Sequence, residues 1–165
     1  MSTAPYPVTE RSITGYHRDE AGDWVAELDC HHNQHVRHKP PFTNRPWVTS
    51  QRSREAHIGA KLNCALCDRR EIPASLHAYK RTPEFTESTI PQGLQAAHAT
   101  KKGVWGQIHV LDGRLQYTIE SPDPEKLELA KGDHANISPE VLHSVAAIGS
   151  VRFYVEFYSL QGSNL

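Results

Sequence analysis

The chain has 165 residues, 38% of them hydrophobic, and a formal net charge of −1 at pH 7. This length fits one ordinary domain or two small ones. Its 10 glycines and 11 prolines indicate a loop-rich globular protein rather than a coiled coil or a disordered tail. Because the net charge is close to zero, a general electrostatic attraction to nucleic acid is not expected.

The lack of a recognisable targeting signal and the cysteine usage predict a cytoplasmic location. Residues Met1 to Glu10 lack the basic segment and the apolar run of a signal peptide. No apolar stretch approaches the roughly 20 residues that a membrane-spanning helix needs, so we expect no membrane contact. The 3 cysteines, an odd number, favour free thiols in a reducing compartment over disulfides.

The first third of the chain predicts a small β module. Ile13–His17 and Trp24–Leu28 are short extended runs separated by polar turn residues, and together they predict a β-hairpin. His35–His38 predicts a further short strand, and Ser50–His57 has the composition of a helix. A segment of this size buries little apolar surface, so it needs an additional cross-link such as a bound metal.

A cysteine–histidine pattern in this module predicts that metal. Cys64 and Cys67 have the C-x-x-C spacing with which two thiolates turn toward one ion. Cys30 and His32 are two residues apart, and on extended backbone such residues point to the same side. The four side chains form a Cys3His set, which is typical of a closed structural zinc site, with His35 as the second candidate for the histidine. The alternative interpretation is three buried free cysteines beside solvated histidines.

Further motifs run through this half of the chain: Ile13–His17, Trp24–Leu28, Gln34–His38, Pro40-Pro41, Asn44–Val48 and the pair Cys64-x-x-Cys67. With these motifs, residues 12–68 resemble a small bacterial domain of unknown function. The resemblance implies no known chemistry. We expect a zinc-ribbon-like β-hairpin module over residues 12–70, with a boundary near residue 72.

The second half of the sequence predicts β structure throughout, so the fold is expected to be mainly β. Val104–Leu111, Leu115–Ile119, His134–Ile137 and Val151–Tyr158 are rich in β-branched and aromatic residues. Asp112-Gly113 lies between two apolar runs and predicts a hairpin turn. Several short strands at this spacing favour a sandwich or a barrel.

Two motifs in this half are similar to the paired motifs of cupins. In Pro139-Glu140-Val141-Leu142-His143 a histidine follows a proline by four residues, and His98 is followed by Gly106 and Gly113. Gly106 stands where a cupin has its metal-binding glutamate. The further shared motifs are Tyr79–Glu87, Ile90-Pro91, His98–Lys101, Gly103–Gly106, Leu111–Leu115 and Val151–Tyr158.

On these motifs, nearly all of residues 76–159 resemble the TehB/YeaR-like family of tellurite-resistance-associated cupins. The resemblance implies a cupin-type jelly-roll barrel, expected over residues 75–162, with His98 and His143 facing its cavity. Some relatives are fused to or named after methyltransferases. The glycine-rich fingerprint of a methyltransferase is absent from this sequence, so we do not extend that activity to it.

The cavity residues allow two arrangements. If the polar face of the last strand lines the cavity, Glu156 joins His98 and His143 in a two-histidine, one-carboxylate site for a divalent metal of unspecified identity. Tyr154 on the same face, and Lys101 at the cavity mouth, would then contact a ligand. If the apolar face points inward, Glu156 is a surface or interface residue.

Three functions are compatible with these features, and the sequence leaves open whether the protein is an enzyme. The favoured one is a metal-containing cupin stress protein that binds a small molecule or an anion. The first alternative is a metal-dependent cupin enzyme of the oxygenase or isomerase type. The second is a zinc module that contacts a protein or RNA. A homodimer is also expected, because the aromatic last strand would otherwise be exposed.

Overall fold

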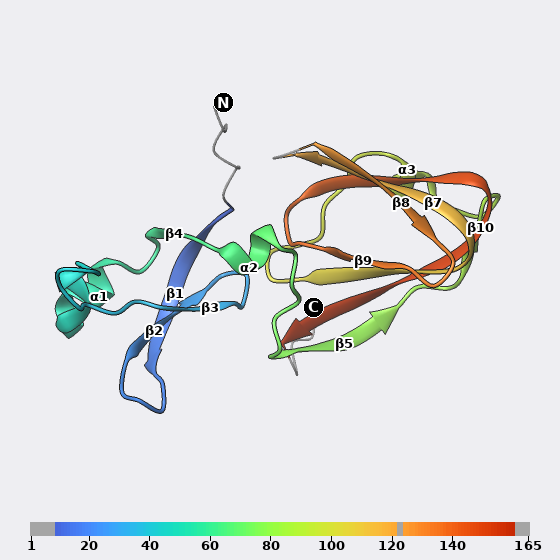
Figure 1. The fold of residues 1–165 in the computed structure, drawn as a ribbon. Helices are drawn as coiled ribbons and strands as arrows, with labels where there is room; N and C mark the ends of the chain where they lie inside the picture. Colours follow the sequence, from blue (N-terminus) through green and yellow to red (C-terminus); the bar gives the residue numbers. More distant parts are fainter. Residues whose placement is uncertain (1–8, 122–123, 161–165) are drawn as a thin grey trace, which may run out of the picture. The chain divides into compact units, whose positions relative to one another are not determined.

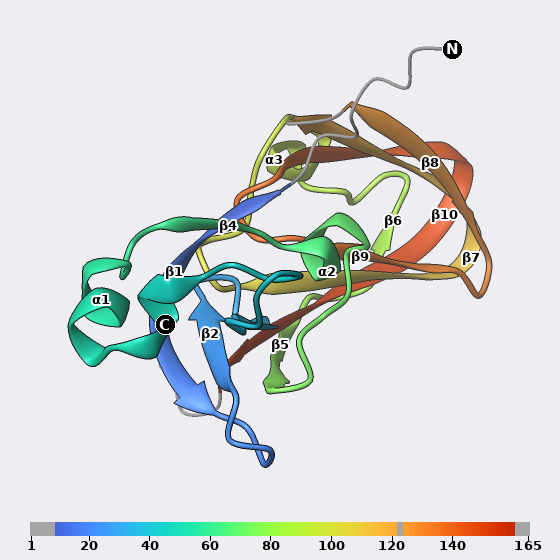
Figure 2. The same cartoon turned by 60° about the vertical axis from the view of Figure 1, so that its left-hand side comes forward.

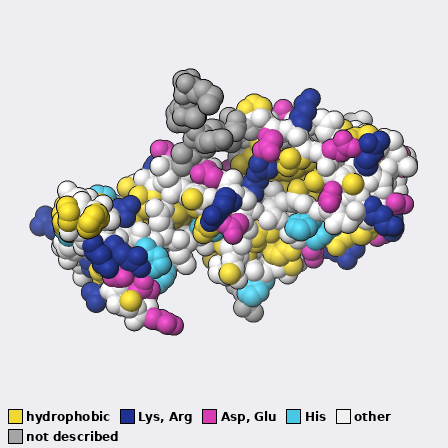
Figure 3. Space-filling model, viewed as in Figure 1, with side chains coloured by type: hydrophobic (Ala, Val, Ile, Leu, Met, Phe, Trp, Pro, Cys, Tyr) yellow, Lys and Arg dark blue, Asp and Glu magenta, His cyan; other side chains and the backbone are white. Residues whose placement is uncertain are grey.

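The computed structural model describes residues 9–121 and 124–160, which divide into two compact units. The N-terminal unit ends at Arg69, and the C-terminal unit begins at Arg70. Among the described residues, no helix has the length and apolar character required to cross a membrane. Basic and acidic side chains are interspersed over the face of the C-terminal unit that Figure 3 shows, in keeping with the near-zero net charge.

The N-terminal unit is built on a four-stranded antiparallel sheet in the order β3-β2-β1-β4 (Figure 1). The predicted hairpin is confirmed, since Arg18 pairs with Trp24 and Ile13 with Leu28. The helix predicted around residues 50–57 is also present, and Ser50 caps it by accepting a hydrogen bond from the Ser53 amide. The elements are β1 (Glu10–Arg18), β2 (Trp24–Leu28), β3 (Asn33–His35), the 3-10 turn η1 (Pro46–Thr49), α1 (Gln51–Ala56), β4 (Lys61–Asn63) and α2 (Ala65–Asp68).

Few side chains form the interior of this unit. Its buried aliphatic residues are Ile13, Val25, Ala26, Leu28, Val36 and Val48. Outside this core, the Trp47 ring stacks on His57 with centroids 4.2 Å apart. The Arg54 guanidinium lies 3.8 Å from the centroid of the Trp24 ring. The small apolar core agrees with the expectation that the unit needs a further source of stability.

The C-terminal unit is one six-stranded antiparallel sheet that curls around an apolar interior (Figures 1 and 2). Its main path is β5-β10-β7-β8, with β6 paired to β10 and β9 paired to β7. The predicted two-sheet jelly roll of cupin type is not confirmed, because β7 and β10 are long strands that run through the whole sheet. The elements are β5 (Leu76–Arg81), β6 (Phe85–Thr86), α3 (Gln92–Gln95), β7 (Trp105–Ser121), β8 (Glu125–Ala130), β9 (His134–Ile137) and β10 (Leu142–Leu160).

The hairpin predicted at Asp112-Gly113 is wrong, because β7 continues through these residues. Gly113 has a φ of 74° and faces an irregular stretch of β10 between Ala147 and Val151. The side-chain alternation of β7 shifts by one residue there: Ile108 and Val110 are buried before it, and Leu115, Tyr117 and Ile119 after it. The glycine therefore bends a continuous strand instead of reversing the chain.

The position of β10 removes the reason given for a homodimer. Along its length β10 pairs with β7 on one edge and with β5 and β6 on the other. Its aromatic residue Phe153 is fully buried in the core of the unit. The strand is therefore central in the sheet, and the homodimer stays a prediction.

Substitution of Gly113 by alanine should destabilise the C-terminal unit strongly. A Cβ atom at this position would lie 2.0 Å from the Ser150 carbonyl oxygen, on a backbone whose φ is already positive. We expect a loss of about 3 kcal/mol or more in the free energy of unfolding, measured by urea denaturation. Gly149→Ala is the matched control, since Gly149 has a φ of 69° but no atom within 4 Å of the added Cβ. It should cost only about 1 kcal/mol, and equal losses in the two variants would contradict the close-contact explanation.

Candidate functional sites

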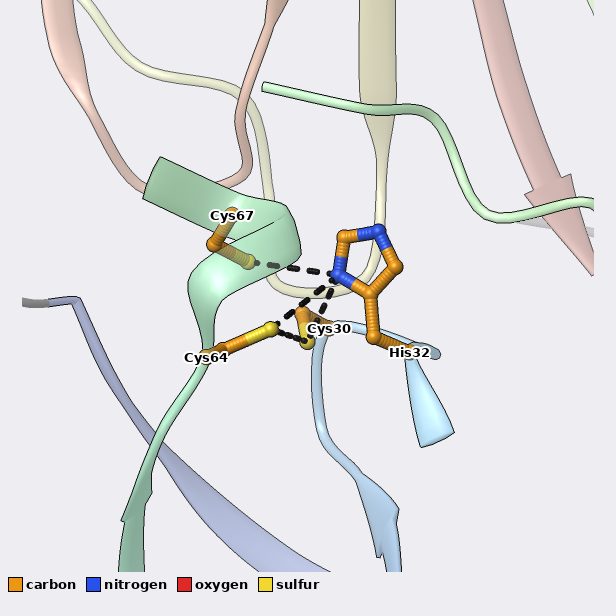
Figure 4. A group of neighbouring side chains, drawn as sticks. All are labelled: Cys30, His32, Cys64 and Cys67. Atoms are coloured by element: carbon orange, nitrogen blue, oxygen red, sulfur yellow. Dashed lines mark hydrogen bonds between the residues drawn. The ribbon is translucent and has the colours of Figure 1, made fainter. Parts of the chain in front are cut away.

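Four side chains that are distant in sequence meet in the N-terminal unit (Figure 4). Cys30 and His32 come from the loop between β2 and β3, Cys64 is the residue that precedes α2, and Cys67 lies within α2. All four residues are buried, and their ligand atoms lie within 4.8 Å of one another. The structure thus brings together the set that the sequence analysis selected.

Four of the six distances between the ligand atoms match the edges of a zinc-sized tetrahedron, and the other two are at most 4.8 Å. Zn–S bonds of about 2.3 Å and a Zn–N bond of about 2.05 Å separate two sulfur ligands by about 3.8 Å, and sulfur from nitrogen by about 3.6 Å. Cys30 Sγ lies 3.9 Å from Cys64 Sγ. Nδ1 of His32 lies 3.4, 3.3 and 3.5 Å from the sulfur atoms of Cys30, Cys64 and Cys67. The group could therefore hold a zinc ion with little rearrangement.

Cys30 and His32 reach the same side by a route that differs from the prediction. The backbone between them is not extended, because His31 has a φ of 72° and the Leu28 amide donates to the His32 carbonyl in a tight turn. Of the two candidate histidines, His32 lies with the three cysteines and His35 does not. His35 is exposed, and its Nε2 lies 2.9 Å from an oxygen of Asp19, away from the cluster.

A buried arginine beside the cluster was not found from the sequence. Arg11 on β1 is only 6% exposed, and its Nε donates a hydrogen bond to Cys67 Sγ at 3.4 Å. Three thiolates around a divalent ion leave one excess negative charge, which a neighbouring guanidinium compensates. No local motif marks this residue, since only the pairing of β1 with β4 brings it near Cys67.

The C-terminal unit contains a cavity of about 350 Å³. Its walls are mainly apolar, and its polar end is formed by buried His143 and half-buried His98 and Thr100. Lys80 and Lys101 are exposed residues that line it as well, so the predicted position of Lys101 agrees with the structure. The apolar wall residues are Ile108, Ile137, Val145, Phe153, Val155 and Phe157.

The two cavity histidines form a pair whose backbone and side chains are both fixed. His98 and His143 exchange two backbone hydrogen bonds of 2.9 and 2.8 Å, and their ring centroids lie 4.1 Å apart. Nδ1 of His98 donates to the Ala96 carbonyl at 2.9 Å. Nδ1 of His143 donates to the Val141 carbonyl, also at 2.9 Å. Because a carbonyl can only accept, each neutral ring carries its proton on Nδ1 and leaves the Nε2 lone pair open.

Two residues predicted to face the cavity lie on the opposite face of β10. Glu156 contacts Nε2 of His109 at 3.1 Å and the Tyr158 hydroxyl at 3.4 Å. The Tyr154 ring stacks on His109 and lies 3.7 Å from the Arg81 guanidinium. The apolar residues Phe153, Val155 and Phe157 take the inward positions instead. Glu156 therefore cannot complete a metal site with the two histidines, and Tyr154 is not a cavity ligand.

Thr100 is a cavity residue that the sequence analysis did not select. Among the described residues, no group forms a hydrogen bond with its buried Oγ1 atom. Its backbone carbonyl accepts a hydrogen bond from the Glu140 amide, which fixes the loop beside His98. Its position between His98 and Lys101 in a shared motif was the available signal.

Each half of the chain matches one known protein family. Residues 80–155 match the family model of the TehB-like domain, and residues 14–71 match that of a family of unknown function, DUF3565. TehB of Haemophilus influenzae, named a probable S-adenosyl-L-methionine-dependent methyltransferase, is 32% identical over 77 residues, which are 44% of this chain. Those residues cover only 27% of that protein, so the chain matches a minor part of its curated relatives.

Two solved structures are similar to this chain. The crystal structure of Haemophilus influenzae TehB aligns with a TM-score of 0.49 and 29% identity, over 53% of this chain and 32% of that one. A crystal structure of a protein from Escherichia coli K12 aligns with a TM-score of 0.50 and 24% identity, over 55% of this chain and 96% of that one. The second likeness shows a shared fold.

The name of the curated relatives corrects the predicted function. Both TehB relatives are named probable S-adenosyl-L-methionine-dependent methyltransferases, which contradicts the predicted metal-containing cupin stress protein and favours neither alternative. These names give S-adenosylmethionine as the methyl donor of those relatives. The geometry also argues against a divalent metal in the cavity, since two imidazoles without Glu156 leave such an ion with too few ligands.

The cavity residues do not fit S-adenosylmethionine itself. That molecule is a sulfonium cation, and the ribose of adenosine cofactors is commonly held by a carboxylate. No carboxylate is present among the described residues that line the cavity, which include two lysines. The described strands of this unit pair only in antiparallel fashion, so they offer no parallel strand–helix turn for a nucleotide.

Acid should weaken the C-terminal unit through His143. Burial lowers the pKa of His143 to about 4, against about 6.5 in an unfolded chain. The folded state therefore resists protonation, so the stability is fully present above pH 6.5 and falls as the pH drops toward 4. Between pH 7 and pH 4 the loss from this one group should be about 3 kcal/mol.

Urea denaturation followed by methyl NMR signals of Ile108 and Val145 measures this unit alone. His143→Gln should reduce the stability difference between pH 7 and pH 4 by about that amount. His77→Gln, at an exposed position on β5, serves as the control and should leave the difference unchanged. An unaltered pH dependence in His143→Gln would contradict a buried neutral imidazole.

Proposed function

Because the chain joins a TehB-like domain over residues 80–155 to a DUF3565 domain over residues 14–71, we propose that it takes part in methyl transfer from S-adenosylmethionine. In this proposal the C-terminal unit holds the methyl acceptor, and the methyl donor is bound outside that unit. The observation that carries the proposal is an apolar cavity of about 350 Å³ with two open Nε2 atoms at its polar end.

Three features support a role in acceptor binding. The cavity has the size of the smaller ligand sites of proteins, which span about 300–1,000 Å³. Its apolar walls remove water from a bound molecule, and its few polar groups fix an orientation. The segment that matches TehB includes the cavity residues His98, Thr100 and His143.

We further propose that Cys30, His32, Cys64 and Cys67 hold one structural zinc ion. The support is their burial and their tetrahedral spacing. Arg11 would stabilise the loaded site by compensating its negative charge. In this proposal the zinc module spans residues 12–70 and the acceptor-binding domain spans residues 75–162.

The methyl-transfer role can be tested by complementation. The TehB protein of Haemophilus influenzae is prepared without the 77 residues that match this chain. S-Adenosylhomocysteine formation is then measured with phenol or thiophenol as the acceptor, with and without the full-length chain. The chain should raise the rate about tenfold or more, because it positions the acceptor.

The control in the complementation experiment is a full-length His98→Phe variant, which removes one open nitrogen but retains an aromatic ring. It should restore less activity than the unaltered chain. A rate that does not respond to the chain, or that responds equally to His98→Phe, would contradict acceptor binding by this cavity.

The zinc site predicts one tightly bound zinc ion per chain. Cys64→Ser should abolish this zinc and unfold the N-terminal unit, whose apolar core is small, while the C-terminal unit stays folded. His35→Ala is the matched control and should retain the metal, because His35 lies outside the cluster. Elemental analysis measures the metal, and NMR follows each unit. Full zinc retention in Cys64→Ser would contradict the assignment.

A further inference from the structure

We infer that the cavity of the C-terminal unit binds a small uncharged molecule through a hydroxyl or thiol group that donates its proton to Nε2 of His98 or His143. The inference rests on the proposed function in one respect, since the oxygen or sulfur of this group would be the atom that becomes methylated. The binding preference itself follows from the hydrogen-bonding capacity of the cavity.

The first step is the direction of the hydrogen bonds. Both Nδ1 atoms are engaged as donors to backbone carbonyls, Ala96 for His98 and Val141 for His143. Among the described residues, neither Nε2 atom has a hydrogen-bond partner. A neutral imidazole with its proton on Nδ1 can only accept at Nε2. The polar end of the cavity therefore presents two adjacent acceptors, and a ligand must bring a donor.

The second step excludes charged ligands. The lone pairs of a carboxylate or another oxyanion would face the lone pairs of the two Nε2 atoms. Protonation of the rings would relieve this repulsion, but His143 is 2% exposed, so a charge there is unfavourable. A cation is disfavoured because no described residue lining the cavity is acidic, and the lysines that line it, Lys80 and Lys101, are exposed, so water screens their attraction for an anion. An uncharged donor remains.

The third step concerns the heteroatom that carries the proton. Thr100 lines the cavity in the same segment as His98, and among the described residues nothing pairs with its buried Oγ1 atom. In this inference its hydroxyl gains a partner by donating to the ligand oxygen or sulfur, while that atom donates to Nε2. A hydroxyl or thiol group satisfies both demands at once, whereas an ether or a hydrocarbon satisfies at most one. The apolar walls then take the carbon frame of the ligand.

Isothermal titration of the full-length protein at pH 8 tests this preference with four probes of similar size. Phenol supplies a donor, toluene supplies none, benzoate is an anion and benzylamine is a cation at this pH. Phenol should bind at least about tenfold more tightly than each of the other three, which corresponds to the loss of a single well-made hydrogen bond. Stronger binding of benzoate or benzylamine would overturn the inference, as would equal binding of toluene.

Two variants separate recognition from folding. His98→Phe should weaken phenol binding about tenfold or more while toluene binds at least as well as before, which shows that the cavity is intact. Lys126→Met should leave phenol binding unchanged, because Lys126 is exposed on β8 and does not line the cavity. Unchanged phenol binding in His98→Phe, or an equal loss of phenol binding in Lys126→Met, would overturn the inference. Titration without S-adenosylmethionine is independent of methyl transfer, so phenol binding with failed complementation would reject the proposed function alone.

Discussion

The pair of backbone hydrogen bonds between His98 and His143 determines the chemistry of the C-terminal unit. These bonds, 2.9 and 2.8 Å long, tie the loop before β7 to the beginning of β10, so that two imidazoles lie side by side at one end of an apolar cavity. Each ring then meets a carbonyl two residues earlier in its own segment, which fixes its proton on Nδ1. The curled sheet supplies the walls, and the strand pairing decides which atoms of the histidines remain open to a ligand.

The two units are stabilised in different ways. The C-terminal unit has a continuous core that includes Ile108, Leu115, Tyr117 and Phe153, all nearly inaccessible to solvent. The N-terminal unit has few buried aliphatic side chains, and its largest concentration of buried polar groups is the Cys3His cluster with Arg11. A metal ion there would link the β2–β3 loop to α2, which lie on segments more than 30 residues apart.

Local sequence patterns predicted the parts of the structure that depend on local geometry. The Trp24–Leu28 strand, the helix capped by Ser50 and the C-x-x-C pair each follow from spacing over a few residues. The failures involve long-range pairing. Asp112-Gly113 has the sequence of a hairpin turn, but β10 lies alongside and keeps β7 extended. Glu156 could not be placed without knowing which face of β10 points inward, and Arg11 and Thr100 acquire their roles only through contacts with distant segments. The predicted function was wrong, because the cavity motifs suggested a metal-containing cupin, whereas the TehB relatives are named probable methyltransferases.

The tautomers of His98 and His143 provide the most direct test of the cavity. Two-dimensional NMR of the 15N-labelled full-length protein at pH 8 distinguishes protonated from unprotonated ring nitrogens. We expect Nδ1 to carry the proton in both residues and Nε2 to be unprotonated, with a change in the Nε2 signals of these two rings when phenol is added. A proton on Nε2 of either ring, or a doubly protonated ring at this pH, would contradict a cavity that presents two acceptors to an uncharged donor.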